Sequence, residues 1–77
     1  MKYELTKNTK QYNGAKLYQI EALKDFSDVK KGELGGWIES IDNLSQYENA
    51  WVYENARVFG NARVYGNARV YENAMGS

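Results

Sequence analysis

The stretch that decides the fold is VYENARVFGNARVYGNARVYENA, residues 52–74, which repeats almost unchanged every six residues. The repeat divides residues 46–75 into five hexads, four of which begin with Val, and each carries Asn at its fourth place and Ala at its fifth. A period of six fits neither an amphipathic helix, which repeats every 3.6 residues, nor a long strand, which alternates every two. It fits a parallel β-helix, in which short strands are joined by sharp corners.

Alternate positions of each hexad predict an inside and an outside. Ala56 and Val58 are two residues apart, so both side chains point inward from one short strand, and Arg57 between them points outward. Asn tolerates the left-handed backbone conformation better than other non-glycine residues, so we expect Asn in that conformation at each corner. Gly60 and Gly66, directly before Asn, relax the corner further.

The first half of the chain does not repeat and begins with a predicted β-hairpin. Asn13-Gly14 suits the positive φ angles of a tight turn, so two antiparallel strands are expected near residues 3–11 and 16–23. The second strand places Tyr18, Ile20 and Ala22 on one face.

The segment after the hairpin predicts a helical turn or an irregular loop. Asp25 is its candidate cap, and Gly32, Gly35 and Gly36 are expected to break it. Trp37-Ile38 follows and is expected to be apolar and buried, although a ligand-stacking role for Trp37 is an alternative.

Composition excludes several classes of chemistry. The 77 residues form one domain and contain no Cys and no His, which removes disulfides, thiolate metal sites, Cys nucleophiles and the commonest general base. Ten basic residues balance ten acidic ones, so a nucleic-acid partner is not expected. No signal peptide or membrane span is expected either, and we predict a cytoplasmic protein.

A longer segment resembles a known family. Residues 25–62, DFSDVKKGELGGWIESIDNLSQYENAWVYENARVFGNA, are similar to the opening of hexapeptide-repeat, left-handed β-helix proteins found in bacteria and many phages. The matching motifs are Asp25-Phe26, Asp28-Val29-Lys30, Gly32, Gly35-Gly36-Trp37-Ile38, Asn43-Leu44-Ser45-Gln46 and the Asn-Ala-Arg-Val units. Members of this group are often described as transferases or polymer-forming proteins without a demonstrated reaction.

The resemblance implies an all-β fold, a short left-handed parallel β-helix of under two coils with an N-terminal β-hairpin cap. Residues 1–43 would form the hairpin and the Gly-Gly-Trp capping segment, and residues 44–77 the β-helix, within one domain. In that family three hexads make one triangular coil, so residues three hexads apart stack on neighbouring rungs about 4.8 Å apart.

The family's enzymes are acyltransferases and carbonic anhydrases, which typically place a catalytic or zinc-binding His between subunits of a trimer. Because this chain has no His, the resemblance supplies no catalytic or metal-binding residue. We therefore expect a protein that is not an enzyme and takes no cofactor or metal. A degenerate acyltransferase-type enzyme that uses Glu, Asp, Lys or Tyr as its base is an alternative.

Stacking across three hexads predicts which outward side chains are neighbours. The expected pairs are Tyr47 under Tyr65, Tyr53 under Tyr71, Trp51 under Arg69, Arg57 under Met75 and Glu54 under Glu72. These columns fit a β-surface that favours aromatic and ladder pairs. They also fit a partner interface, because Tyr and Arg are enriched at binding hot spots. The candidate partner-binding residues are Tyr47, Tyr53, Phe59, Tyr65, Tyr71, Arg57, Arg63 and Arg69.

Two general features of short repeat arrays predict self-association. The open end of a coil exposes unpaired backbone groups, and an array of fewer than about three repeat units is weak alone. We expect a homo-oligomer, either a dimer through the C-terminal coil or a trimer, that also binds another protein. The resemblance adds a phage-type inhibitor of a host protein as one form of this module. A purely structural assembly unit is the second hypothesis.

Overall fold

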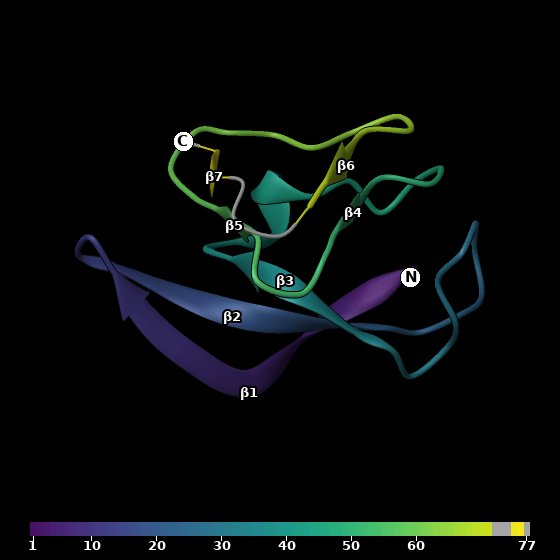
Figure 1. Cartoon of the computed structure of the whole chain (residues 1–77), viewed down its shortest axis with the longest axis horizontal. Coiled ribbons are helices and arrows are strands. Elements are labelled where there is room, and N and C mark those ends of the chain that lie inside the picture. Colours follow the sequence, from purple (N-terminus) through teal and green to yellow (C-terminus); the bar gives the residue numbers. More distant parts are fainter. Residues whose placement is uncertain (72–74, 77) are drawn as a thin grey trace.

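The computed structural model describes residues 1–71 and the backbone of residues 75–76. Three longer strands come first, β1 (Tyr3–Tyr12), β2 (Ala15–Ala22) and β3 (Leu34–Ile38), as Figure 1 shows. A 3-10 turn, η1 (Ile41–Asn43), precedes the short strands β4 (Trp51–Val52), β5 (Arg57–Val58), β6 (Arg69–Val70) and β7 (Met75–Gly76). The described residues contain no α-helix, which confirms the all-β prediction.

β1 and β2 form the hairpin predicted from Asn13-Gly14. Both turn residues have positive φ, 50° and 82°, as a type I′ turn requires. The strands pair antiparallel, with one irregularity in the middle of β1. Ile20 and Ala22 are buried and Tyr18 is half-buried, so this face of β2 points to the core as predicted.

Asp25 caps the loop that follows, but no helical turn forms there. Its Oδ1 accepts a hydrogen bond from the Lys31 backbone N at 2.8 Å. Phe26 and Val29 pair with each other in a single antiparallel bridge, which folds the loop back on itself.

Gly35 and Gly36 lie inside strand β3, where the sequence predicted a break. β3 pairs antiparallel with β2 and parallel with β5. A Cβ on Gly35 would come within 2.7 Å of the Trp51 ring, and one on Gly36 within 2.6 Å of the Ala56 carbonyl oxygen. The two glycines therefore allow the repeats to pack directly against this strand.

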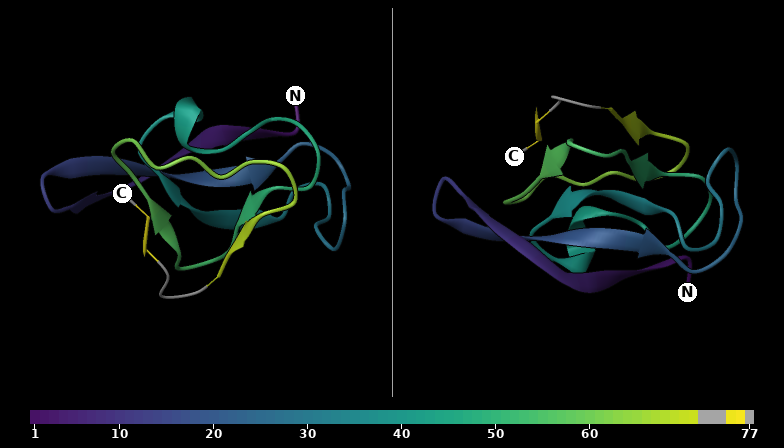
Figure 2. Two further views of the ribbon diagram at one scale, coloured as in Figure 1. Left: turned by 90° about the horizontal axis from the view of Figure 1, so that it is seen from above. Right: turned by 60° about the horizontal axis from the view of Figure 1, so that its bottom comes forward.

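Beyond β3, segments far apart in sequence pair in parallel. The pairs are Trp37-Ile38 with Arg57-Val58, Arg57-Val58 with Met75-Gly76, Trp51-Val52 with Arg69-Val70, and Leu44 with Val64. The right view of Figure 2 shows these segments layered over the hairpin in sequence order, from purple to yellow. The predicted neighbours Trp51–Arg69 and Arg57–Met75 are confirmed. One sheet of order β1-β2-β3-β5-β7 joins the hairpin to the repeats.

The first coil is two residues longer than the next, so Ile38 and Leu44 each pair with a residue 20 positions on. Leu44 pairs with Val64, 20 residues on, because the chain takes eight residues instead of six from Leu44 to the equivalent place in β4. The Ser45 backbone N donates to the Val64 carbonyl at 2.8 Å, so the residue below Tyr65 is Ser45. The prediction that Tyr47 lies directly under Tyr65 is therefore wrong. The extra residues shift Tyr47 to one side.

The corners place the left-handed conformation one residue earlier than predicted. Positive φ occurs at Glu48, Glu54, Gly60 and Gly66, and at none of the described hexad asparagines. In the second hexad the Ala56 N donates to the Tyr53 carbonyl at 2.8 Å, and the equivalent bond closes the next two corners. Positive φ at only the first central residue is the pattern of a type II′ turn, which favours Gly there. The prediction for Asn is therefore wrong, and the residue before Asn makes the corner.

The Val and Ala positions of the hexads form the core, as predicted, except that Ala68 is exposed. Buried members are Ala50, Val52, Ala56, Val58 and Val64, with Ala62 and Val70 partly buried against them.

The two tryptophans differ from their predicted exposure. Trp51 is fully buried instead of facing outward, because Tyr3 and Phe26 pack edge-on against its ring with centroid distances of 6.2 and 5.2 Å. Trp37 is half-buried, and the Lys10 Nζ lies 4.2 Å from the centroid of its ring. Tyr3 and the loop after β2 thus cover Trp51, and Lys10 of β1 covers part of Trp37.

Gln46 joins the start of β1 to the repeats. Its Oε1 accepts hydrogen bonds from the backbone N of Lys2 and of Tyr3, at 2.8 and 3.2 Å. The buried Lys2 Nζ donates to the carbonyls of Ala50 and Tyr47, at 2.6 and 3.3 Å. These bonds fix the position of the first residues against the corner that precedes β4.

Candidate functional site

The predicted partner-binding residues separate onto three sides of the molecule. Tyr53, Tyr71 and Arg69 belong to the β4–β6 side, and Phe59 and Arg57 to the β5 side. Tyr47, Tyr65 and Arg63 belong to the side on which Leu44 pairs with Val64. The structure therefore does not gather all eight residues into one surface.

On the β4–β6 side the predicted aromatic pair is present. The rings of Tyr53 and Tyr71 stack with centroids 4.6 Å apart and planes 12° apart, which confirms the expected neighbours. The Tyr53 hydroxyl donates to Asp28 Oδ1 at 2.8 Å. Burial, together with this hydrogen bond and the Asp28 charge, raises the pKa of Tyr53 to about 12. The predicted pair of Glu54 with Glu72 lies partly outside the described residues.

Arg69 holds the same loop from the neighbouring position. Its guanidinium donates a hydrogen bond to Ser27 Oγ and lies 3.8 Å from Asp28 Oδ2. The side chains on this side therefore bind the segment between β2 and β3 to the repeats. Their polar groups are occupied within the chain.

The β5 side is covered by the tip of the hairpin. The Phe59 ring packs edge-on against Tyr12 at 5.6 Å, and the Arg57 guanidinium lies over the Tyr12 ring at 4.5 Å. Phe59 and Arg57 are half-buried, and the buried Arg57 Nε has no hydrogen-bond partner among the described residues. These contacts dock the hairpin on the repeats.

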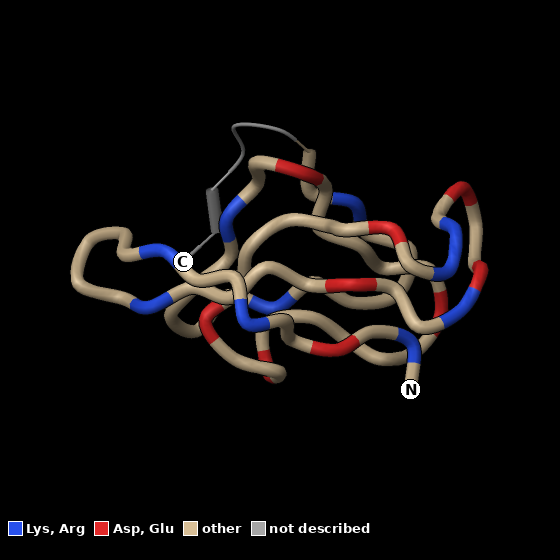
Figure 3. The backbone as a smooth tube through the Cα atoms, turned by 90° about the horizontal axis from the view of Figure 1, so that it is seen from below, with Lys and Arg blue, Asp and Glu red and all other residues tan. Residues whose placement is uncertain are grey.

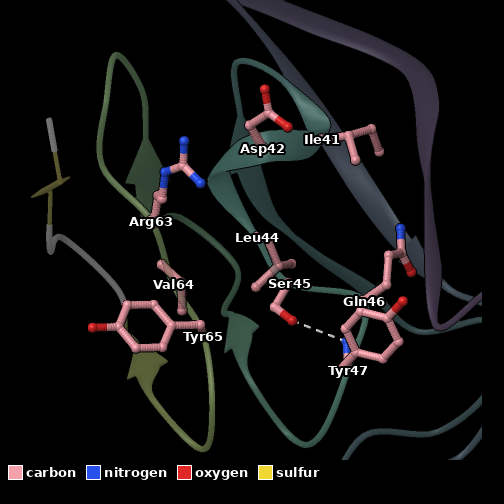
Figure 4. Close-up of a pocket in the computed structure, with 9 residues that line it drawn as sticks. All are labelled: Ile41, Asp42, Leu44, Ser45, Gln46, Tyr47, Arg63, Val64 and Tyr65. Atoms are coloured by element: carbon pink, nitrogen blue, oxygen red, sulfur yellow. Dashed lines mark hydrogen bonds between the residues drawn. The ribbon is translucent and has the colours of Figure 1, made fainter.

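The third side forms a groove of about 350 Å³. Figure 4 shows Tyr65 on one side of it and Tyr47 on the other, with Asp42 and Arg63 together at the far end. The residues that line it are Ile41, Asp42, Leu44, Ser45, Gln46, Tyr47, Arg63, Val64 and Tyr65. We call this the Tyr47–Tyr65 groove.

The walls of the groove are exposed and its floor is apolar. Tyr47 and Tyr65 are 79% and 70% exposed, while Leu44 and Val64 beneath them are buried. The Ser45 Oγ accepts a hydrogen bond from the Tyr47 backbone N at 3.0 Å, which holds this part of the wall. The groove can therefore accept an apolar or aromatic group between two rings.

Ile41 and Asp42 belong to the groove but were not predicted to contribute. Ile41 is 43% exposed, and both residues lie in η1. Ser40 and Asn43, three residues apart, form the capping box of this turn. This spacing is the signal in the sequence that could have located the turn.

Metal and charge features add little to this site. Within the described part of the chain, no three Asp or Glu side chains gather into a possible metal site. Figure 3 shows basic and acidic residues interspersed along the backbone. No helix among the described residues has the length and apolar character needed to cross a bilayer.

No family model matches this chain, and neither does any curated protein with which it was compared.

Proposed function

We propose that this protein is a non-catalytic protein-binding module that self-associates, with the Tyr47–Tyr65 groove as its binding face. One observation carries the proposal. Among the described residues six large apolar side chains are exposed, and three of them, Ile41, Tyr47 and Tyr65, line this groove. Exposed apolar side chains gathered in one place are typical of interaction sites, and Tyr is enriched at binding hot spots.

The groove is favoured over the other two predicted surfaces because its side chains are free. Tyr53, Arg69 and Arg57 make contacts with the loop after β2 or with the hairpin. Tyr47, Tyr65 and Arg63 leave their rings and guanidinium open to solvent. Binding a partner there would cost no internal contact of those side chains.

We propose a short left-handed β-helix as the scaffold of this module. The hexad period, the parallel pairs 18 and 20 residues apart and the sharp corners between short strands support a parallel β-helix, and its left hand is what the family resemblance implies. The resemblance to phage-encoded hexapeptide-repeat proteins adds a bacterial host protein as the partner, which the module would inhibit by occupying its surface.

The test compares aromatic residues inside and outside the groove. A tagged chain is incubated with a bacterial lysate, and the affinity of the captured protein is then measured for Tyr47→Ala, Tyr65→Ala and Tyr71→Ala. We expect each groove variant to weaken binding about tenfold or more, the effect of losing a hot-spot side chain. Tyr71, which is 54% exposed on the β4–β6 side, is the matched control and should bind normally.

Equal affinities for the wild type and both groove variants would rule out this face. Circular dichroism of each variant separates loss of binding from loss of the fold.

A further inference from the structure

We infer that the Tyr47–Tyr65 groove also takes a second copy of this chain, in a two-fold dimer in which Arg63 of each copy meets Asp42 of the other. The inference rests on the proposed function, because it names one occupant of the proposed binding face. It departs from the sequence-based expectation of a dimer through the last coil, since it uses a side of the repeats instead of an end.

The groove carries one anion and one cation. Asp42 and Arg63 lie together at one end of it, both exposed (Figure 4). Within the parts of the chain that the structure describes, Arg69 and Asp28 form an ion pair, whereas neither Asp42 nor Arg63 does.

The fold dictates why opposite charges meet at this end. Arg63 directly precedes Val64, which pairs with Leu44, and the Val64 backbone N donates to the Asn43 carbonyl at 2.8 Å. Asp42 directly precedes Asn43 in η1. Arg63 therefore lies over Asn43, one residue from Asp42, so the cation and the anion come from neighbouring rungs at the same end of the groove.

A two-fold interface requires a surface that complements itself, because every contact occurs twice with the roles exchanged. The groove meets this requirement in charge, since each copy offers one cation and one anion. It also meets it in apolar surface, since Ile41, Tyr47 and Tyr65 of one copy can pack on the same residues of the other. A purely acidic or purely basic ligand would meet one like charge in this groove.

The overall charge also permits association. Ten basic and ten acidic residues give a formal net charge of zero, so two copies do not repel each other at a distance.

Charge reversal tests whether Arg63 of each copy contacts Asp42 of the other. Sedimentation equilibrium is measured on the pure wild-type chain, on Arg63→Glu, on Asp42→Arg and on an equimolar mixture of the two variants. In Arg63→Glu two acidic residues face each other at both contacts, and in Asp42→Arg two basic residues do. We expect each variant alone to dimerise at least about tenfold more weakly than the wild type.

The mixture is expected to recover a dimer. A copy carrying Arg63→Glu offers two anions and a copy carrying Asp42→Arg offers two cations, so both contacts of the mixed dimer are attractive. Lys7→Glu, which reverses an exposed charge on β1, is the control and should dimerise like the wild type.

Three outcomes would overturn the inference. They are a wild-type chain that stays monomeric, an oligomer or open-ended growth that the two reversals do not change, and a mixture that stays monomeric. A monomeric chain that still captures a host protein through Tyr65 would overturn the dimer alone and leave the proposed function standing.

Discussion

At the scale of a single residue, the Asn43 side chain makes four hydrogen bonds, two to neighbouring residues and two to the next rung. Its Oδ1 accepts from the backbone N of Glu39 and Ser40, at 3.1 and 2.9 Å. Its Nδ2 donates to the carbonyls of Gly60 and Ala62, at 3.2 and 2.8 Å. The Asn43 side chain is buried. Only an amide supplies an acceptor and two donors in this volume.

Replacing Asn43 should destabilise the fold strongly. Asn43→Ala removes the side-chain partner of the Ser40 N and of the Gly60 and Ala62 carbonyls, while the Glu39 N keeps its bond to the Val58 carbonyl, and we expect the free energy of unfolding to fall by about 2–4 kcal/mol. Asn43→Asp should lower the free energy of unfolding by as much. The carboxylate keeps the acceptor but turns a second oxygen toward the carbonyls of Gly60 and Ala62. Urea unfolding measures both, with the exposed Asn61→Ala as the matched control. A loss no larger than that of Asn61→Ala would show that the four bonds contribute little.

At the scale of the elements, the corners differ in how well their residues suit the turn. Gly60 and Gly66 occupy the position of positive φ in two corners, whereas Glu54 occupies it in another with φ of 28°. A residue with a Cβ in left-handed backbone costs roughly 1 kcal/mol relative to Gly. The corner at Glu54 is therefore strained, and the two that follow are not.

Exchanging these residues should move stability in opposite directions. We expect Glu54→Gly to raise the free energy of unfolding by about 1 kcal/mol and Gly66→Ala to lower it by a similar amount. A Cβ on Gly66 meets no atom within 4 Å, so the cost there is that of the backbone alone. Thermal unfolding of the two variants measures both effects. A stabilising Gly66→Ala would refute this account of the corners.

Features set by adjacent residues or by the unbroken repeat were predicted correctly from the sequence, and a feature that depends on an interruption of the repeat was not. The hairpin depends on two adjacent residues, Asn13-Gly14, and was predicted correctly. The stack of Tyr53 on Tyr71 follows from an unbroken six-residue period and was also predicted. Tyr47 was misplaced because the chain takes two extra residues between Leu44 and β4, while the Asn and Ala positions of the hexads continue there unchanged.

The burial of Trp51 could not be predicted for a different reason. The alternation rule places Trp51 outward, and the rings that cover it come from Tyr3 and Phe26, which are far away in sequence. The groove was predicted in part. Tyr47, Tyr65 and Arg63 were candidates, but their separation from the other five depends on how the hairpin and the loop after β2 pack on the repeats.

At the scale of the whole molecule, the N-terminal segment places a titratable amine inside the protein. Lys2 Nζ donates to two carbonyls and lies 5.0 Å from the centroid of the Phe26 ring. Burial, with a smaller effect of Lys24, lowers the pKa of Lys2 to about 8 from 10.5. Burial also raises the pKa of Tyr3, whose hydroxyl donates to the Leu44 carbonyl. Stability should therefore depend on pH above neutrality.

The sign follows from which state binds more protons. Between pH 8 and about 10.5 the unfolded chain holds the Lys2 proton more tightly than the folded chain, so stability should rise with pH. Above about pH 10 the raised pKa values of Tyr3 and Tyr53 act in the opposite sense, because the unfolded chain loses those protons first. We expect a maximum of the unfolding free energy near pH 10.

Urea unfolding from pH 7 to 11 measures this profile, and Lys2→Met is the diagnostic variant. Lys2→Met should remove the rise of the unfolding free energy between pH 8 and 10, whatever its effect on the absolute stability. A rise that persists in Lys2→Met would have another origin.

The contacts of Lys2 join segments that are far apart in the sequence, and this separation predicts an order of folding. The hairpin closes through a two-residue turn, whereas the bond from Lys2 Nζ to the Ala50 carbonyl spans 48 residues. Closing a longer loop costs more entropy, and pairing between distant segments slows folding. We therefore expect the hairpin to form early and the first residues to dock late. During synthesis, the start of the chain must wait for the corner before β4 to leave the ribosome before it reaches its final place.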